Sequence, residues 1–410
     1  MKVEKQRFSA IFHTYIGHLL VIGFMVGGYI YNVKFIQVGI PHLGEVKLGI
    51  SPPEMGGLMA LLAIITTVVA IIWGIQLGKL KWNVHQKIDA IIVVGIAQLV
   101  LTLGAPLIPE KFTLTTWIIL TSTTLGFAIP LTFPLLYELI PTKHRGLVAG
   151  FIAGLAYLAG NWSPAEWTIE SLATESLLMI IPGLGIFLVL RLSGFLNKWI
   201  PLRSDYAAYE GRFTSRPLVG VVGLMFIVFF IDSLGFMRII STPALVNATW
   251  QAPFETRAIL GVVHFVAGVG AGYLYSRTDE WIIGIIALGL YIIADGLFSL
   301  YTPAMNQVEL TSIACLYCAT VSVYTVNNFA IWADISTREN VSKNAALGIG
   351  IGGWLSSFLS TTVAFQLATS VPFATHLLLP AILAAIALTV ISLLLKNKSV
   401  ILLGKEPKRM

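Results

Sequence analysis

The stretch YELIPTKHRG, residues 137–146, separates two long apolar runs of the chain. The run before it reads LTTWIILTSTTLGFAIPLTFPLL, and the run after it reads LVAGFIAGLAYLAG. Between them the stretch places Glu138, Pro141 and Arg145 within a few residues. Pro141 ends the preceding helix, because proline cannot continue the backbone hydrogen-bond ladder. We therefore interpret the stretch as a polar connection between two helices that lie in an apolar environment.

The composition places most of the chain in a membrane. Of its 410 residues, 56% are hydrophobic and 11% are charged, whereas soluble domains average about 25% charged residues. The apolar runs are continuous rather than alternating, which is typical of helices and not of a β-barrel. Cys315 and Cys318 share one apolar run, and we interpret them as small core residues. The sequence predicts an all-α membrane protein.

The apolar runs and the loop signals between them predict twelve transmembrane helices. Their predicted ranges are 14–41, 54–77, 88–108, 114–139, 146–161, 174–190, 217–241, 258–275, 281–301, 308–333, 344–369 and 376–395.

Basic residues orient the predicted helices. If the N-terminus is cytoplasmic, 21 of the 26 Lys and Arg residues fall in cytoplasmic segments, as the positive-inside rule requires. The outer loop after the fifth helix holds Glu166, Glu170 and Glu175 and no base. The net charge of +6 is thus an orientation signal, and no nucleic-acid partner is expected. With its short loops, the chain is predicted to be a multi-pass protein of a prokaryotic cytoplasmic (inner) membrane, with both termini in the cytoplasm.

The chain divides into two halves that resemble each other. The longest inner segment, 197–216, is predicted to be a cytoplasmic linker between six-helix bundles at 1–196 and 217–410. YELIPTK matches WADISTR, GIQLGK matches GYLYSR, and VGIPHL matches ISTPAL, in the same order along the two halves. These matches indicate an internal duplication, and parallel six-helix repeats are common in transporters.

GIQLGK and YELIPTKHRG resemble two signatures of the major facilitator superfamily, G-x-x-x-D-R-x-G-R-K and E-x-x-P-x-x-x-R-G. The chain departs from the first signature at Gly78, where the superfamily has an acid. The resemblance implies two pseudo-symmetric six-helix bundles that transport a solute by alternating access. It also implies a conformational latch at the inner edge, made of Gly74, Gly78, Lys79, Glu138, Arg145, Asp334 and Arg338. The alternative is that these charges are ordinary interfacial residues.

In this superfamily the substrate binds near the midplane between the halves. Lys34 and Arg238 are the two bases assigned inside predicted helices, where a base costs roughly 2.5–3.5 kcal/mol. They lie on the equivalent first helices of the two halves, and we expect them to form a clamp for an anion. The alternatives are that the two bases are not symmetry mates, and that Arg238 extends to the membrane surface.

Other polar residues in the predicted helices are candidates for binding or coupling. Asp232 is expected to pair with a base or to carry a coupled proton, and His264 is a second proton-coupling candidate. Asp295 is expected to have a structural partner. Candidates for hydrogen bonds to substrate are Tyr31, Asn32, Tyr157, Asn327 and Asn328. The alternative for each is a hydrogen bond between helices.

The sequence thus favours a secondary active transporter of a small polar, anionic solute, with the proton as one candidate for the coupling ion. One alternative is an exporter of hydrophobic or lipid-like compounds, and another is a membrane receptor or scaffold without transport. We expect no catalytic residues, no enzymatic activity, no cofactor and no metal site. The expected partners are the lipid bilayer, a small-molecule substrate and protons, and the expected state is a monomer. The identity of the solute, the direction of transport and the coupling ion are not predicted.

Overall fold

The computed structural model describes residues 17–162, 168–194, 210–214 and 217–403. Every regular element among these residues is a helix. Eleven described helices are long and apolar enough to cross a membrane. A twelfth, α7 (Thr142–Trp162), completes the predicted number but is not among those eleven. Most of the predicted linker at 197–216, and the ends of the chain at 1–16 and 404–410, lie outside the described residues.

The N-terminal half contains six of these helical segments. The first helix runs over Gly17–Lys47 and includes π-helical segments η1 (Tyr31–Gly39) and η2 (Leu43–Lys47) on either side of α2 (Ile40–His42). It is followed by α3 (Pro52–Leu80), α4 (Val84–Gly104) with the turn η3 (Ala105–Leu107), α5 (Lys111–Thr132) with α6 (Pro134–Leu139), α7, and α8 (Ile169–Leu192).

The C-terminal half repeats this arrangement. It comprises α10 (Leu218–Ile240), the turn η6 (Pro243–Ala248), α11 (Phe254–Tyr275), α12 (Glu280–Ser299) and α13 (Gln307–Asp334). The next helix is continuous through α14 (Val341–Leu347), the π-helical segment η7 (Gly348–Leu355) and α15 (Ser356–Ser370), and α16 (Phe373–Leu403) is the last.

Local sequence signals account for most helix boundaries. Asn83 and Asn306 begin α4 and α13 with capping boxes, and Lys81, in the left-handed conformation, ends α3. The first helix runs past its predicted end, because the chain passes Pro41 in helical geometry between two π-helical segments. A π-helical segment is a recognised way of inserting an irregularity into a helix without ending it.

One predicted boundary was wrong in a way that affects the site. Glu170 and Glu175 do not lie in an outer loop, because Thr168 caps α8 and the helix begins at Ile169. Glu175 therefore lies inside the membrane-spanning segment and is buried. Arg145 likewise lies within α7, whose first turn begins before the predicted boundary.

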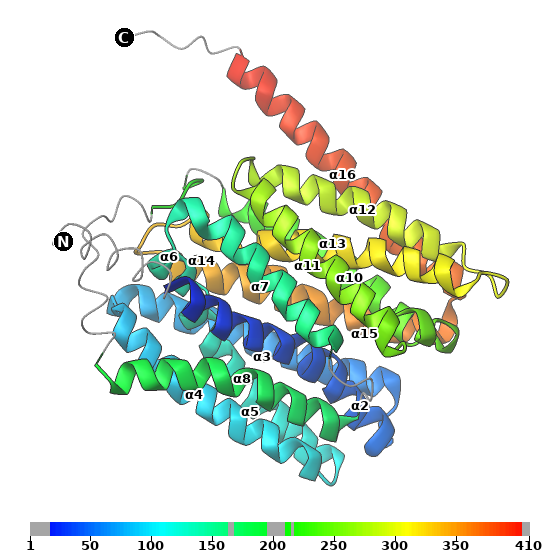
Figure 1. The fold of residues 1–410 in the computed structure, drawn as a ribbon, viewed down its shortest axis with the longest axis horizontal. Coiled ribbons are helices and arrows are strands. Elements are labelled where there is room, and N and C mark those ends of the chain that lie inside the picture. The colour runs from blue at the N-terminus through cyan, green and yellow to red at the C-terminus, as the bar shows by residue number, and fades with distance from the viewer. Residues whose placement is uncertain (1–16, 163–167, 195–209, 215–216, 404–410) are drawn as a thin grey trace.

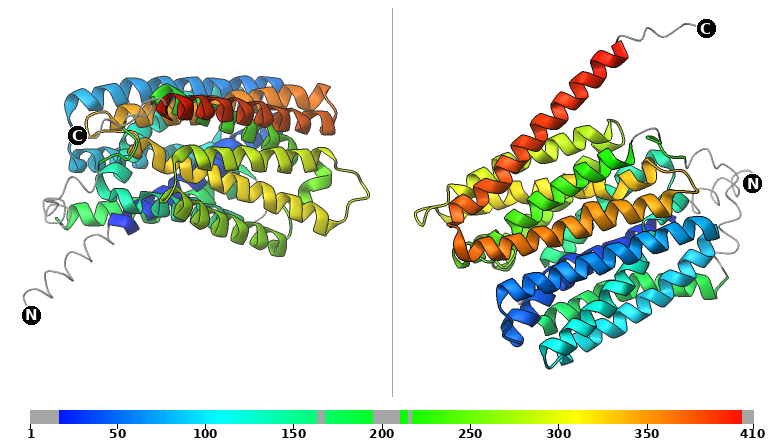
Figure 2. Two further views of the ribbon diagram at one scale, coloured as in Figure 1. Left: turned by 90° about the horizontal axis from the view of Figure 1, so that it is seen from above. Right: turned by 180° about the vertical axis from the view of Figure 1, so that it is seen from behind.

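The two bundles lie side by side, with their helices running in similar directions. Figure 1 shows α3, α4, α5 and α8 in one bundle and α10, α12, α13 and α15 in the other, and the view from behind in Figure 2 shows the same division. Contacts between the halves include those of α7 with α11 and α13, of α3 with α14, η7 and α15, and of α6 with α13.

Glycines bring α7 and α11 close together. A Cβ atom on Gly150 would lie 2.6 Å from the carbonyl oxygen of Gly268, and one on Gly272 would lie 2.5 Å from that of Gly146. Small residues four apart on each helix allow the two backbones to touch, as in other membrane helix pairs. The glycine spacing of the fifth helix therefore serves the contact between the halves.

Candidate binding cavity

A cavity of about 260 Å³ lies between the halves. Its lining comes from the first helix, α4, α5, α7 and α8 on one side and from α10, α11, α13 and the helix containing η7 on the other. Much of the lining is apolar or aromatic. The polar side chains in it include Tyr29, Asn32, Lys34, Gln37, Gln98, Thr124, Tyr157, Asn161, Asp232, Ser233, His264, Tyr324, Asn328 and Ser357.

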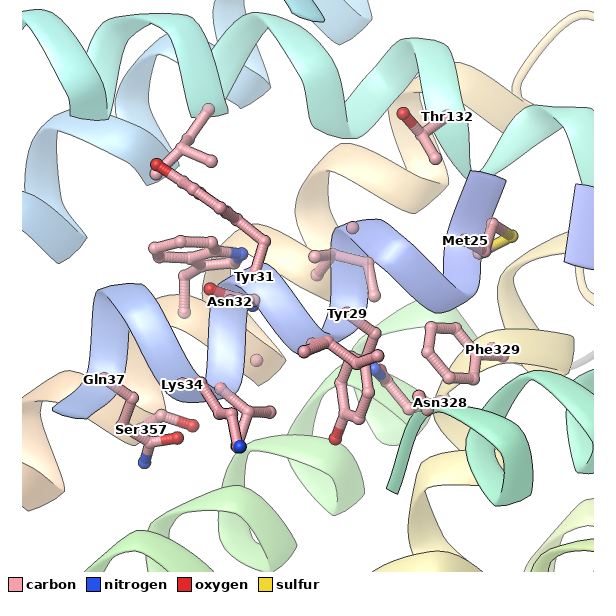
Figure 3. Close-up of a pocket in the computed structure, with 18 of the residues that line it drawn as sticks. Met25, Tyr29, Tyr31, Asn32, Lys34, Gln37, Thr132, Asn328, Phe329 and Ser357 are labelled. Carbon is pink, nitrogen blue, oxygen red and sulfur yellow. The ribbon is translucent and has the colours of Figure 1, made fainter. Parts of the chain in front are cut away.

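Lys34 lines the cavity and is paired with an acid. Its Nζ lies 2.7 Å from Oε1 of Glu175 on α8, and the two side chains are 12% and 7% exposed. Figure 3 shows Lys34 and Tyr29 on one side of the first helix and Tyr31 on the other. The cation that the sequence predicts at the cavity is thus present, with a neutralising partner from the same half.

Arg238 is not among the residues that line the cavity. Its guanidinium donates hydrogen bonds to the carbonyl oxygens of Ala368 and Val371, at 3.2 and 3.4 Å, and lies over the ring of Phe373. These carbonyls are at the end of α15, where a helix leaves acceptors unsatisfied. The structure therefore does not bring Lys34 and Arg238 together as a clamp.

Asp232 lines the cavity from α10 and pairs with tyrosines rather than with a base. Its Oδ1 accepts hydrogen bonds from Tyr291 and Tyr317 at 2.7 and 3.0 Å, and its Oδ2 accepts one from Tyr324 at 2.6 Å. All three donors belong to α12 and α13 of the same half. Three hydroxyl donors satisfy a buried carboxylate without a cation, so Asp232 is held within its own bundle.

Asp295 on α12 is fully buried nearby, and neither of its carboxyl oxygens has a hydrogen-bond partner within the described part of the chain. A Cβ atom on Gly235 would lie 2.8 Å from its Oδ1. The structural partner predicted for Asp295 is therefore not found among the described residues. Asp295 does not line the cavity.

His264 belongs to a polar chain that crosses between the halves. Its Nδ1 lies 2.8 Å from the hydroxyl of Ser322, and its ring stacks on Tyr157 with centroids 4.2 Å apart. The hydroxyl of Tyr157 lies 2.6 Å from that of Tyr29, which is 3.2 Å from Oγ1 of Thr325. The first helix and α7 are thereby joined to α11 and α13 beside the cavity.

The remaining predicted hydrogen-bonding residues differ in where they point. The hydroxyl of Tyr31 is turned into the N-terminal bundle, where Gln98 and Thr102 donate to it. Asn32 lines the cavity, and its side-chain oxygen has no hydrogen-bond partner among the described residues.

The two asparagines of α13 also differ. Asn328 lines the cavity and accepts a hydrogen bond from the indole of Trp332 at 3.2 Å. Asn327 is not among the lining residues and packs against Met225 of α10.

Aromatic side chains from both halves form one layer of the cavity lining. The ring of Phe329 on α13 stacks on Phe133, with centroids 6.0 Å apart, and meets Tyr29 edge-on at 5.1 Å. All three residues line the cavity. Asp334 lies one to two helical turns beyond Phe329 on α13, about 7.5 Å along the axis.

A buried ion pair joins the halves beyond this aromatic layer, and we refer to Arg145, Tyr275 and Asp334 as the inner gate. Nη1 of Arg145 lies 2.7 Å from Oδ1 of Asp334, and both side chains are fully buried. The hydroxyl of Tyr275 donates to Oδ2 of Asp334 at 3.0 Å. Arg145 also donates to the carbonyl oxygens of Tyr137 and Ile140. The structure thus brings together two of the predicted latch residues from opposite halves.

The other predicted latch residues lie around the inner gate. Glu138 pairs with Lys87 of its own half at 2.5 Å. A Cβ atom on Gly74 would lie 2.6 Å from Cβ of Ala346, so this glycine permits close contact between α3 and α14. Gly78, Glu138 and Arg338 line a second cavity of about 330 Å³ between the halves, and Lys79 and Arg338 are exposed.

Several residues of the site were not singled out from the sequence. Tyr29 precedes Tyr31 in the motif YIYNVK, but helical spacing alone does not say which tyrosine faces the other half. Glu175 was assigned to a loop. Tyr291, Tyr317 and Tyr324 lie far from Asp232 along the chain, and only the tertiary packing makes them its partners.

By sequence, no protein-family model and no curated protein matches this chain. By structure, it is similar to the MFS (major facilitator superfamily) proton:xylose symporter XylE bound to 6-bromo-6-deoxy-D-glucose, with a TM-score of 0.61, 15% identity, and 93% of this chain and 95% of that chain covered. It is also similar to a variant of the E. coli fucose:proton symporter FucP, with a TM-score of 0.55, 14% identity, and 93% and 97% covered. The chain therefore has the fold of the major facilitator superfamily.

Proposed function

We propose that this protein is a secondary active transporter that moves a small polar organic solute across the membrane by alternating access. The observation that carries the proposal is a cavity lined by both halves, together with a buried ion pair that joins the halves beyond it along α13. A rocking motion that breaks the Arg145–Asp334 pair would expose this cavity to the side that the basic residues predict to be cytoplasmic.

The likeness to two proton symporters supports coupling to protons. Asp232 and His264 remain candidates for the coupled group, because both line the cavity. The solute is proposed to carry a negative charge, because Lys34 is the base that lines the cavity. Arg238 is not part of this proposal.

Two other kinds of solute are favoured by particular observations. A neutral hydroxylated solute would find hydrogen-bonding partners in Tyr157, His264 and Asn328, and the two similar structures belong to symporters of xylose and fucose. A hydrophobic solute, as expected of an exporter, would fit the apolar and aromatic part of the lining, which includes Phe229 and Phe236.

A panel of solutes distinguishes these possibilities. The purified protein is tested in detergent with organic acids, phosphates, sugars, amino acids and hydrophobic cations, because a ligand that binds the folded state raises the melting temperature. Compounds that bind are then offered to proteoliposomes with and without a pH gradient. The proposal expects uptake above equilibrium for at least one polar solute when a gradient is present. Binding without uptake under any gradient would favour a receptor instead.

Filling the cavity tests whether it is the site. Gly28 lines the cavity, and a Cβ atom there would have no neighbour within 4 Å. Gly28→Leu should therefore fit without a clash, occupy the solute's space and reduce binding and uptake at least tenfold, about 1.4 kcal/mol. Gly23→Leu on the same helix is the control, since Gly23 also has open space but does not line the cavity. Equal uptake by both variants would place the site elsewhere.

A further inference from the structure

Lys34 separates a buried acid from the cavity. The lysine lines the cavity, whereas Glu175, whose Oε1 lies 2.7 Å from the ammonium group, is not among the lining residues. A solute in the cavity can therefore reach Lys34 and not the acid behind it. Lys34 also passes close to Gly160 of α7, where an added Cβ atom would lie in ordinary contact with its Cε, at 3.7 Å.

The second carboxyl oxygen of Glu175 is unused. Oε2 is buried and has no hydrogen-bond partner among the residues that the structure describes. A buried polar atom without a partner is uncommon and calls for a physical reason. A proton could bind to this oxygen without breaking any of the described hydrogen bonds of the carboxyl group.

The other charged groups around this pair are few in the described chain. From α11, Arg257 lies close enough to repel Lys34, and it donates to the carbonyl oxygens of Ala252 and Asn161. On α8 itself, Glu170 pairs with Lys47 of the first helix, and both are largely exposed. The charged residues of α4 that face α8 lie at its far end, where Asp89 pairs with Arg191.

An anion that binds Lys34 must compete with Glu175. If the anion takes the lysine, the ionised carboxylate is left buried without its partner, which is strongly unfavourable. A proton on Glu175 removes this cost, because the acid is then neutral. The exchange leaves the net charge of the site unchanged, because Lys34⁺ faces one negative charge before it, on Glu175, and one after it, on the anion.

We propose that Lys34 and Glu175 form a proton-linked anion site, in which a small organic monocarboxylate replaces Glu175 on Lys34 while Glu175 takes up one proton. The only covalent change is the O–H bond formed when Glu175 takes a proton from water, and one anion and one proton enter together. A single ammonium group matches a single negative charge, and the surrounding lining favours an apolar or aromatic body. The inference rests on the proposed transport function and specifies its solute class and its coupled group.

The unmodified protein provides the first test, with benzoate as the probe and benzamide as its neutral analogue. Calorimetric titration in two buffers of different ionisation enthalpy counts the protons taken up per benzoate. We expect about one proton per benzoate near neutral pH, and an affinity that falls by up to about tenfold for each unit of rising pH. Benzoate binding without proton uptake, benzamide binding as tightly as benzoate, or no binding of benzoate would each overturn the proposal.

Variants then assign the two roles. Lys34→Gln should weaken benzoate binding roughly 10- to 100-fold, the loss expected for a charge-assisted hydrogen bond. Glu175→Gln imitates the protonated acid and should bind benzoate without proton uptake between pH 5 and 7, at least as tightly as the parent does at pH 5. The matched controls are Lys47→Gln and Glu170→Gln, which remove the exposed pair on the same two helices and should behave like the parent.

The same titration compares the alternative coupled groups. Asp232→Asn and His264→Asn should keep the proton uptake that accompanies benzoate. If Asp232→Asn abolishes it and Glu175→Gln does not, the proton belongs to Asp232 and the inference is wrong.

Failure of this inference and failure of the proposed function give different results. If proton-driven uptake of a solute by the parent is unchanged in Lys34→Gln and Glu175→Gln, the protein is a transporter without this site. If no solute is taken up by the parent, the transport function itself is refuted, whatever the calorimeter records for benzoate.

Discussion

At the scale of single residues, two bases inside membrane helices are stabilised by different kinds of acceptor. Lys34 faces the carboxylate of Glu175 across 2.7 Å. Arg238 instead spreads its guanidinium over backbone carbonyls at the end of α15. A planar group with five donors suits several carbonyl acceptors, whereas an ammonium group acts as a point charge. The proposed exchange therefore concerns the contact between Lys34 and Glu175, whereas Arg238 stabilises the end of α15.

This difference predicts the effect of changing Arg238. Arg238→Gln should lower the free energy of unfolding by about 1–2 kcal/mol, because two hydrogen bonds from a charged donor are lost. Affinity for the solute should change less than about twofold, because Arg238 does not line the cavity. Thermal unfolding and titration of the same preparation measure both quantities. A large loss of affinity at an unchanged melting temperature would show instead that Arg238 takes part in solute binding.

The residue types at the site could be predicted from the sequence better than their partners. A lysine, an aspartate and a histidine inside apolar helices stand out by their cost in the membrane, and Lys34, Asp232 and His264 all line the cavity. Their partners depend on packing between helices distant in sequence. Glu175 was missed because it was counted with the acids of the outer loop, at the very start of the predicted helix 174–190, whereas α8 begins at Ile169 and places Glu175 more than one turn inside it.

At the scale of helices, the contact between α7 and α11 depends on the absence of side chains. Gly146 and Gly150 face Gly268 and Gly272, and backbone atoms of one helix occupy the space where the other would carry Cβ atoms. The same glycines explain why α7 is less apolar than the other spans and still lies in the bundle. The position of α7 in the bundle is stabilised by close van der Waals contact with α11 rather than by large apolar side chains.

Two glycines on α11 test this explanation. A Cβ atom on Gly272 would lie 2.5 Å from the carbonyl oxygen of Gly146, whereas one on Gly270 would meet nothing within 4 Å. Gly272→Ala should force the helices apart and lower stability by about 1–3 kcal/mol. Gly270→Ala should be neutral or stabilising, because alanine is the better helix former by about 1 kcal/mol. Equal melting temperatures for the two variants would contradict close packing at this contact.

The helices themselves were largely predictable, because a membrane requires long continuous apolar segments. All twelve predicted spans overlap observed helical segments. The irregular segments were not predictable. The pattern of apolar residues does not distinguish the π-helical geometry of η1 and η7 from an α-helix. Nor does it reveal the tertiary contacts there, such as that of Trp332 with Gly348 at the start of η7.

At the scale of the whole molecule, the proposed alternating-access cycle makes this structure a conformation with the inner gate closed. Arg145 and Asp334 are fully buried between the halves, and Asp334 lies five residues beyond Phe329 of the cavity lining on α13. Removing one member of a buried ion pair leaves the other uncompensated, at a cost of about 3–5 kcal/mol. This cost destabilises the closed conformation. It does not apply to an open conformation in which water reaches the remaining charge, so the population should shift toward the open conformation.

The distance between the two halves at the inner gate tests the account most directly. Spin labels are placed on cysteines at Lys143 and Thr337, which are exposed on opposite halves beside the gate, after Cys315 and Cys318 are replaced by serine. The parent should give one short distance in the absence of solute. Asp334→Asn should add a longer distance, and Tyr275→Phe, which removes one hydrogen bond to the same carboxylate, should add less of it. If parent and Asp334→Asn give the same single distance, the ion pair does not control opening, and alternating access through this gate is contradicted.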